Sequence, residues 1–225
     1  MTQTNPKDND EKTLWNQKYS QTSHSSLEPD PFLLSAYSEF LSQTRPGSVL
    51  DVAGGVGRHS LWLAERGWKV KLVDISGVGV DLAQENFHRR KRLHVMDAPA
   101  MSGAPNPVPE AAPKGSAAEL AEQLETQVLD LSQVHDLGHE QYDLILVFFY
   151  LQRSLFPALI SALRPGGFLI YKTYTTESKR LGRGPSHPTY LLQPNELLHA
   201  FQSLRILHYH ETIKEKGIAE MVAQK

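Results

Sequence analysis

The stretch VLDVAGGVGRH, residues 49–59, decides the fold. An apolar run ends on Asp51, a turn of small residues follows, and a helical pattern starts at about Ser60. This order predicts a buried strand, a tight loop and the first turn of a helix. Glycines 54, 55 and 57 let the loop adopt conformations closed to other residues and let a ligand approach its backbone. In an open α/β sheet, such a loop lies beyond the carboxyl end of a strand, where ligands bind.

Two nucleotide-binding patterns are incomplete in this loop. A dinucleotide fingerprint needs Gly-x-Gly-x-x-Gly, and Ser60 stands where its third glycine belongs. A phosphate-binding loop of the Walker type needs Gly-Lys-Ser/Thr, which the stretch lacks. A structural turn that binds no ligand is therefore an alternative at this point.

Composition limits the class of protein. The chain has 225 residues, 40% of them hydrophobic, which suits one domain with a substantial core. A formal net charge of -2 offers no global basic field for nucleic acid. The absence of cysteine excludes disulfides, thiolate zinc sites and a cysteine nucleophile. Because the sequence has neither an apolar leader nor a run of 18 apolar residues, we expect a cytoplasmic protein.

The hydrophobic pattern along the rest of the chain predicts alternating strands and helices. We expect strands at residues 68–74, 126–131, 142–150 and 168–172, and helices at 32–41, 60–67, 117–124 and 155–163. The 142–150 segment is apolar almost throughout, which favours a central strand buried on both faces. Arg164-Pro165-Gly166-Gly167 predicts a turn. The chain thus has the pattern of a doubly wound α/β fold.

We expect one domain at residues 13–225 after a mobile polar tail at residues 1–12. Residues 98–118 are rich in proline and alanine. Because strands and helices in such folds are usually joined by about 2–6 residues, we expect this segment to be an insertion or a flexible excursion.

With Asp51 two residues before Ala53-x-Gly55-x-Gly57, the loop resembles motif I of class I S-adenosylmethionine-dependent methyltransferases. The usual form is acidic-x-Gly-x-Gly-x-Gly, so Ala53 is a departure at the first glycine. An apolar strand, a helix, a Leu-x-Pro-Gly-Gly turn and another apolar strand form a second block typical of that class. The two blocks imply a seven-stranded, mostly parallel sheet with an antiparallel C-terminal hairpin, formed here by residues 204–209 and 218–223.

A finer resemblance is to small bacterial methyltransferases of the tellurite-resistance and thiopurine type. It depends on residues 150–153, 163–167 and 191–197, and on a Trp-x-x-x-Tyr segment at residues 15–19. The resemblance implies S-adenosylmethionine as the cofactor. It also implies that Trp15 covers the sulfonium end, where an aromatic face favours a cation; an alternative is a helix that merely packs on the domain.

The acid that ends the second strand, Asp74, is expected to bind the ribose. It lies 17 residues after Gly57, and one carboxylate can accept from both hydroxyls of a vicinal diol. It could instead cap the following helix. The resemblance further implies that Asp130 contacts the adenine amino group and Leu131 flanks the ring, with Asp97 as a rival for Asp130. The expected cofactor-binding residues are Trp15, Asp51, Ala53, Gly55, Gly57, Asp74, Ile75, Asp130, Leu131 and Phe148.

Methyl transfer from a sulfonium is an in-line displacement that mainly needs alignment and exclusion of water. A base is required only when the acceptor carries a proton. After the 142–150 strand, the chain lacks the Asn/Asp-Pro-Pro-aromatic pattern of enzymes that methylate amide or base nitrogens. The candidate acceptor residues are Arg153 for an anion, Tyr150 to orient the acceptor or pass a proton, and His187 as a base. Structural roles are the alternatives for all three.

We therefore expect a methyltransferase that acts on a small-molecule sulfur, chalcogen or oxygen nucleophile. The basic segment 88–92 and the insertion leave RNA or protein acceptors as an alternative, although nucleic acid is the less favoured partner. A non-catalytic binder of the cofactor is a third possibility. The pairs His135/His139 and His208/His210 lack a third ligand at metal spacing, so no metal is expected. The sequence makes no prediction about oligomeric state.

Overall fold

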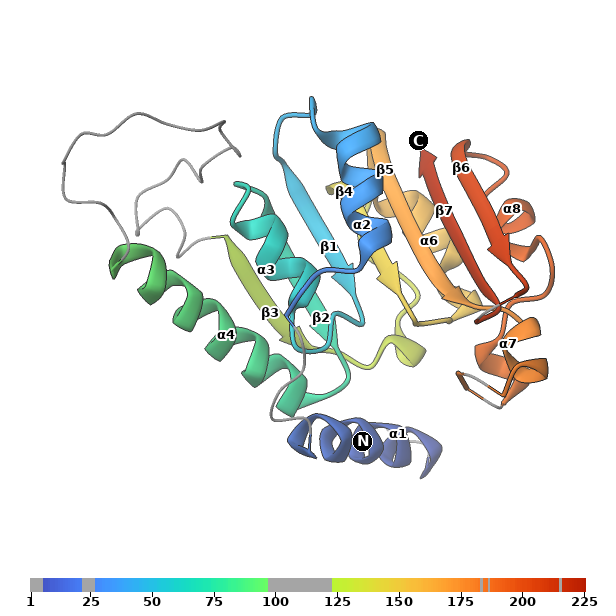
Figure 1. Cartoon of the computed structure of the whole chain (residues 1–225), viewed down its shortest axis with the longest axis horizontal. Coiled ribbons are helices and arrows are strands. Elements are labelled where there is room, and N and C mark those ends of the chain that lie inside the picture. Colours follow the sequence, from blue (N-terminus) through green and yellow to red (C-terminus); the bar gives the residue numbers. More distant parts are fainter. Residues whose placement is uncertain (1–5, 22–26, 97–122, 183, 186, 215) are drawn as a thin grey trace.

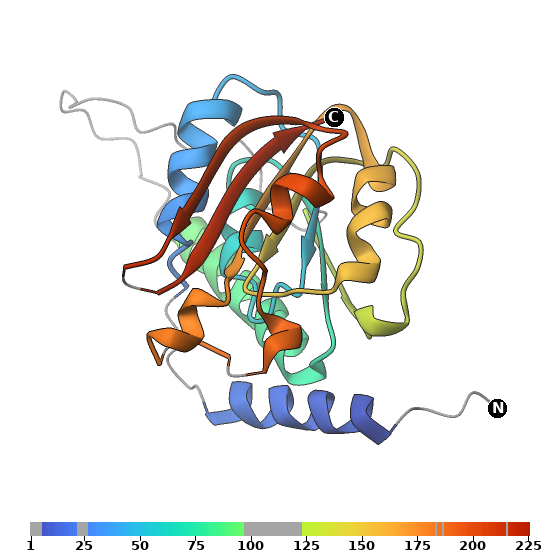
Figure 2. The same ribbon diagram turned by 90° about the vertical axis from the view of Figure 1, so that its right-hand side faces the viewer.

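The structure is a computed structural model that describes residues 6–21, 27–96, 123–182, 184–185, 187–214 and 216–225. A central sheet carries helices on both faces, and one further helix, α1 (Pro6–Gln21), lies across one end of the sheet (Figures 1 and 2). The expected insertion at 98–118, the expected helix up to residue 122 and the rival acid Asp97 all lie outside the described residues.

The sheet has seven strands in the order β3-β2-β1-β4-β5-β7-β6. The first five in this order are parallel, and β7 pairs antiparallel with both β5 and β6. The strands are β1 (Ser48–Val52), β2 (Lys69–Asp74), β3 (Leu124–Val128), β4 (Tyr142–Phe148), β5 (Leu163–Tyr174), β6 (Arg205–Thr212) and β7 (Ile218–Gln224). The strand order reverses between β1 and β4, and ligands of open α/β sheets bind at such a switch point.

Most of the helical segments are short. They are α2 (Pro31–Ala36), a π-helical turn η1 (Tyr37–Leu41), α3 (Arg58–Ala64), α4 (Gly77–Met96), η2 (Leu131–Gln133), η3 (Arg153–Leu155), α6 (Phe156–Ala162), α7 (Glu177–Arg180), η4 (Pro188–Tyr190) and α8 (Glu196–Ala200). Local sequence explains two of the starts. Asp30 accepts a hydrogen bond from the Phe32 amide and precedes a proline at the first position of α2. Gly57, with φ +80°, precedes α3.

Alternation along the central strands builds two hydrophobic cores, one on each face of the sheet. One core joins Leu144, Leu146 and Phe148 to α2, η1 and α3. The other joins Ile145, Val147 and several residues of β5 and β7 to α6 and α8. Because β4 contributes to both cores, its apolar run is buried on both faces, as the sequence predicts.

The predicted fold class is confirmed: the sheet has seven strands, is mostly parallel and ends in an antiparallel C-terminal hairpin. Some boundaries differ from the predictions. α1 includes residues 6–12 of the expected tail, and β3 occupies 124–128 rather than 126–131. The expected turn at 164–167 belongs to β5, which starts at Leu163 because that residue already pairs with Tyr142 across a register shift.

Candidate active site

The glycine-rich loop after β1 forms the centre of the site. Ala53, Gly55 and Gly57 all have positive φ, between 56° and 80°, so three residues of one short loop are left-handed. The Gly57 amide donates to the Gly54 carbonyl at 3.0 Å and closes the turn. A Cβ on Gly57 would lie 3.0 Å from the Cβ of Ala83, so this glycine lets α4 pack closely on the loop. The loop thus has the shape predicted for a ligand-binding turn.

Asp51 is held beneath the loop. Its side chain is 1% exposed and accepts a 2.6 Å hydrogen bond from the Ser60 hydroxyl on α3. Burial raises the pKa of this carboxyl to about 6, against the lowering effects of Ser60 and Arg58. The geometry therefore ties the end of β1 to the first turns of α3.

Asp74, at the end of β2, connects the loop to the start of α4. One of its oxygens accepts from the Gly55 amide at 2.9 Å and the other from the Ser76 amide at 2.8 Å. Burial raises the pKa of this carboxyl, against the lowering effect of both amides. Each carboxylate oxygen has a further lone pair, so a ribose diol and these two amides can be accepted together.

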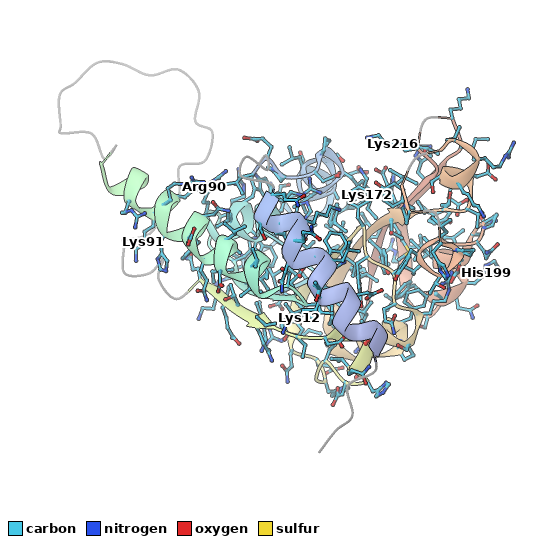
Figure 3. All side chains as sticks on the ribbon, turned by 90° about the horizontal axis from the view of Figure 1, so that it is seen from below. Lys12, Arg90, Lys91, Lys172, His199 and Lys216 are labelled. Carbon is cyan, nitrogen blue, oxygen red and sulfur yellow. The ribbon has the colours of Figure 1, made fainter. Side chains whose placement is uncertain are left out.

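Helix α1 covers this site. Figure 3, which looks up at the carboxyl ends of the parallel strands, shows α1 lying across them. The Asn16 side chain accepts from the Ser76 hydroxyl at 2.7 Å and from the Val78 amide at 3.4 Å. Five residues earlier in the helix, Glu11 accepts a hydrogen bond from the Tyr190 hydroxyl. Polar contacts thus fix α1 on the rim at two places.

Tyr19, rather than Trp15, lies against the glycine loop. A Cβ on Gly55 would lie 2.5 Å from the Tyr19 hydroxyl, and one on Gly79 would lie 3.0 Å from two of its ring carbons. Burial, and then the nearby Asp74 carboxylate, raises the pKa of Tyr19. Trp15 stacks on Tyr19 with 5.6 Å between ring centroids, so the two aromatics do share one face of α1.

The other residues expected at the cofactor site surround the same rim. Ile75 is half-buried and directly follows Asp74. Asp130 accepts from the Ser132 amide and hydroxyl and caps η2, which begins at the buried Leu131. Phe148 ends β4 and is 7% exposed. The fold therefore places the predicted residues of β1, β2 and β4, and of the segment after β3, at the carboxyl ends of neighbouring parallel strands.

The segment that follows β4 is under backbone strain. Phe149 has φ +57°, which is rare for a bulky residue, and its amide donates to the Lys172 carbonyl at 2.7 Å. Such conformations cluster at functional sites. Tyr150 comes next; burial raises the pKa of its hydroxyl, and its carbonyl accepts a 3.0 Å hydrogen bond from the Tyr171 hydroxyl.

Arg153 is engaged with the chain itself. Its guanidinium donates to both oxygens of Glu196, at 2.5 and 2.9 Å, and to the carbonyls of Thr189 and Leu191, each at 2.9 Å. The Glu196 hydrogen bond is the main cause that raises the pKa of Arg153. An anionic acceptor would have to compete with these contacts.

His187 is exposed. Its Nδ1 accepts from the Thr189 amide at 3.3 Å, and its ring lies 5.9 Å from that of Tyr190. Among the described residues, no group of three or more His, Asp or Glu side chains could hold a metal ion.

A polar cluster that no sequence motif marks lies beside Phe148. Lys172, on β5, bridges Asp30 at 2.8 Å and Glu220 at 2.9 Å, and its side chain is 11% exposed. Burial alone lowers the pKa of Lys172, but the hydrogen bonds to the two carboxylates raise it above its ordinary value. His59 packs on Phe148 with 4.2 Å between ring centroids. The cluster joins α2, α3, β5 and β7, and its members are too far apart in sequence to form a motif.

The basic segment 88–92 lies on the half of α4 that is farther from this rim. Figure 3 shows Arg90 and Lys91 at a distance from α1. Arg90 pairs with Glu65 at 2.9 Å, and Arg89 donates to Asn86 at 2.8 Å. Glu85, Asn86, His88, Arg89 and Arg92 line a depression of about 330 Å³ there.

A protein-family model described as "Methyltransferase domain" matches residues 30–212. The chain belongs to this methyltransferase family. The match and the seven-stranded sheet confirm a class I S-adenosylmethionine-dependent methyltransferase. No described helix of this methyltransferase is long and apolar enough to cross a membrane.

Solved structures share the fold of this methyltransferase. TehB from Haemophilus influenzae is 16% identical, with a TM-score of 0.62 over 94% of this chain and 67% of that one. Geranyl diphosphate C-methyltransferase from Streptomyces coelicolor A3(2), solved with S-adenosyl-L-homocysteine, is 14% identical, with a TM-score of 0.60 over 99% of both chains. At these identities the likeness concerns the fold alone.

One curated relative is similar over a shorter region. Ribosomal RNA small subunit methyltransferase C from Alcanivorax borkumensis is 37% identical over 67 residues. These make up 30% of this chain and 21% of the relative, so the match spans only about a fifth of that protein.

Proposed function

We propose that this methyltransferase transfers a methyl group from S-adenosylmethionine to a sulfur, chalcogen or oxygen atom of a small molecule. The observation that carries the proposal is the position of α1. Asn16, Tyr19 and Glu11 hold this helix over the glycine loop, and a covered rim suits a small acceptor better than a folded RNA or protein.

The residues at the rim fit the cofactor. Gly55 keeps the space over the loop free of a side chain of its own, and the two oxygens of Asp74 face the loop and the start of α4. We assign the ribose to Asp74, the adenine side to Asp130 and Leu131, and the methionine side to the loop between Asp51 and Gly57. When bound, the cofactor supplies an activated methyl group, so the chain has to align the acceptor and keep water out.

The chain's own side chains have two tasks in this proposal. Tyr19 and Trp15 cover the loop and exclude water while α1 is docked. Phe148, Phe149 and Tyr150, at the end of β4, orient the acceptor at the switch point of the sheet. The assignments of Tyr150, Arg153 and His187 to the acceptor stay predictions.

A ribosomal or other RNA acceptor is the second candidate. It is favoured by the 67-residue match to an rRNA methyltransferase and by the basic segment 88–92. A non-catalytic cofactor-binding module is the third, and turnover of any acceptor would exclude it.

One labelling experiment separates these candidates. The protein is incubated with methyl-tritiated S-adenosylmethionine and a cell extract divided into small-molecule, RNA and protein fractions. The proposal expects label in the small-molecule fraction. Label confined to RNA or protein would overturn it, and cofactor binding by calorimetry without any labelled product would favour the non-catalytic module.

A further inference from the structure

The cations beside the ends of β4 and β5 are already neutralised. Lys172 contacts the carboxylates of Asp30 and Glu220. Two of the four hydrogen bonds that Arg153 donates go to the carboxylate of Glu196. An anionic acceptor would have to displace a carboxylate from one of these two cations, at the cost of an existing ion pair. The charge balance of these side chains therefore favours a neutral acceptor.

His59, unlike Lys172 and Arg153, has a buried nitrogen that forms no hydrogen bond with the described residues. Its side chain is 3% exposed, and its Nε2 atom has no hydrogen-bond partner among the described residues. A buried polar atom without a partner destabilises a fold, so its presence asks for another explanation. Burial, together with the nearby Arg58, lowers the pKa of His59 to about 3, so the ring is neutral at physiological pH.

The position of His59 in the fold points to a ligand as the partner of its Nε2 atom. The residue lies two positions after Gly57, at the start of α3, and its ring packs on Phe148 where β4 ends. His59 thus stands between the cofactor loop and the strained segment at Phe149. In an open α/β sheet these are two sides of the ligand-binding crevice.

The side of His59 that faces the end of β4 is aromatic, because Phe148 packs on its ring. Phe148 in turn lies 6.4 Å from Phe32, between ring centroids. The other neighbours of His59 are charged: Arg58, Asp30 and Lys172 all lie near enough to affect its pKa. Asp30 pairs with both Lys172, at 2.8 Å, and Arg58, at 3.9 Å, so the charges on this side are engaged with one another. The aromatic side suits the apolar part of a small ligand, and the unpartnered nitrogen of His59 supplies a polar contact beside it.

We propose that the Nε2 atom of His59 accepts a hydrogen bond from the methyl acceptor, and that the acceptor is a neutral hydroxyl or thiol compound with an aromatic body. The acceptor oxygen or sulfur forms its bond to the methyl carbon as the bond between that carbon and the sulfonium sulfur breaks, which leaves S-adenosylhomocysteine. The acceptor's proton passes to Nε2 and from there to solvent. This inference rests on the proposed function and names the acceptor class for that same site. Because the His59 ring is only 3% exposed, the side chains around Phe149 have to move aside for the acceptor to reach it.

The test compares two matched pairs of probes on the full chain loaded with S-adenosylmethionine. Phenol and benzyl mercaptan are the neutral members; 4-hydroxybenzoate and 4-(mercaptomethyl)benzoate are the same molecules with a carboxylate added. We expect at least one neutral probe to be methylated and its charged partner to be a poorer acceptor. In His59→Phe, kcat/KM for that probe should fall about tenfold, the effect of one lost hydrogen bond.

Two further measurements distinguish binding from a structural role. His59→Phe should keep its affinity for S-adenosylhomocysteine and should melt no lower than the wild type, because an unpartnered buried nitrogen is removed. Histidine-selective NMR of the wild type loaded with S-adenosylhomocysteine should show the His59 ring signal shifting when the neutral probe is added.

His208 offers a matched control. Its Nε2 is also buried and without a partner among the described residues, but it lies on the edge strand β6. Its ring contacts Phe32, at 5.5 Å between centroids, and not Phe148, so a variant at His208 tests whether any change to this aromatic cluster has the same effect. His208→Phe should leave kcat/KM unchanged. The inference is overturned if the charged probes are preferred, if His59→Phe and His208→Phe behave alike, or if a protein that binds the cofactor neither binds nor methylates either neutral probe. Failure of cofactor binding itself would instead count against the proposed function.

Discussion

The hydroxyl of Tyr19 lies 2.5 Å from the position that a Cβ on Gly55 would occupy. One residue belongs to a helix near the N-terminus and the other to the loop after the first strand of the sheet. Their close approach explains why the loop needs glycine there, beyond the left-handed conformation that Gly55 adopts at φ +56°. It also means that α1 packs directly on the glycine loop, so a change in one of them affects the other.

We therefore predict that Gly55→Ala weakens binding of S-adenosylhomocysteine as well as stability. The methyl group enters the space over the loop and displaces Tyr19. Gly166→Ala is the matched control, because Gly166 also has positive φ, +80°, but nothing lies within 4 Å of its Cβ position. Both variants should lose about 1–2 kcal/mol of unfolding free energy from backbone strain. Only Gly55→Ala should lose affinity in calorimetry, and equal affinities would contradict this interpretation of the contact.

Asp74 supports a second prediction about cofactor affinity. Asp74→Ala removes a charged acceptor for a ribose diol and should weaken binding by about 3 kcal/mol, or more than a hundredfold in Kd. Because Asp74 also accepts from the Gly55 and Ser76 amides, the melting temperature has to be measured in parallel. Asp136→Ala serves as the control, because Asp136 also accepts from a backbone amide, that of Gly138 at 2.8 Å, but lies in the loop before β4 and should not change the affinity. Unchanged affinity in Asp74→Ala would move the ribose contact elsewhere.

Much of the fold is readable from local sequence. The apolar run of β4 predicts a central strand because both faces of that strand are buried, and the acid before the glycines marks the end of β1 because the small residues permit a tight turn. Asp74 is found by the same logic at the end of β2. In each case the signal and its cause are only a few residues apart.

The acceptor side of the site could not be predicted in this way. Lys172 appears in sequence as a single lysine after an apolar strand, and its partners Asp30 and Glu220 are supplied by distant elements. Arg153 follows β4 as a candidate anion site, yet its partners come from residues 189–196. The importance of Tyr19 over Trp15 depends on how α1 docks, which the spacing of the two aromatics leaves undetermined.

Arg153 yields a third prediction. If it serves to hold residues 189–196, both Arg153→Gln and Glu196→Gln should destabilise the fold, since each breaks the same pair. Arg153→Gln should have the larger effect, because it also removes the donors to the Thr189 and Leu191 carbonyls. We expect the broken pair itself to cost about 1 kcal/mol of unfolding free energy in each variant, because the Arg153 side chain is 39% exposed and solvent screens the pair. Urea unfolding measures it. A loss of acceptor turnover in Arg153→Gln but not in Glu196→Gln would support the alternative role in binding an anion.

The pH dependence of stability tests the burial of Asp51. Its pKa is raised from 3.8 to about 6 in the folded state, so the folded protein binds a proton more tightly than the unfolded chain does. Stability from this group is therefore highest below about pH 4, declines as pH rises towards 6, and is constant above that. Asp51→Asn removes the ionisation and should stabilise the protein at pH 7.5. The gain is at most about 3 kcal/mol, the free energy that corresponds to a rise of the pKa from 3.8 to about 6.

The measurement is the difference in unfolding free energy between wild type and Asp51→Asn from pH 4 to 8. The advantage of the variant should shrink as the pH falls, since the wild-type carboxyl is then protonated in both states. Ser60→Ala is a second variant to compare, because it removes the 2.6 Å hydrogen bond that partly stabilises the ionised carboxylate. Its unfolding free energy should therefore fall more between pH 4 and 8 than that of the wild type. A wild-type protein whose stability instead rises between pH 4 and 6, relative to Asp51→Asn, would mean that Asp51 gains more from its neighbours than it loses by burial.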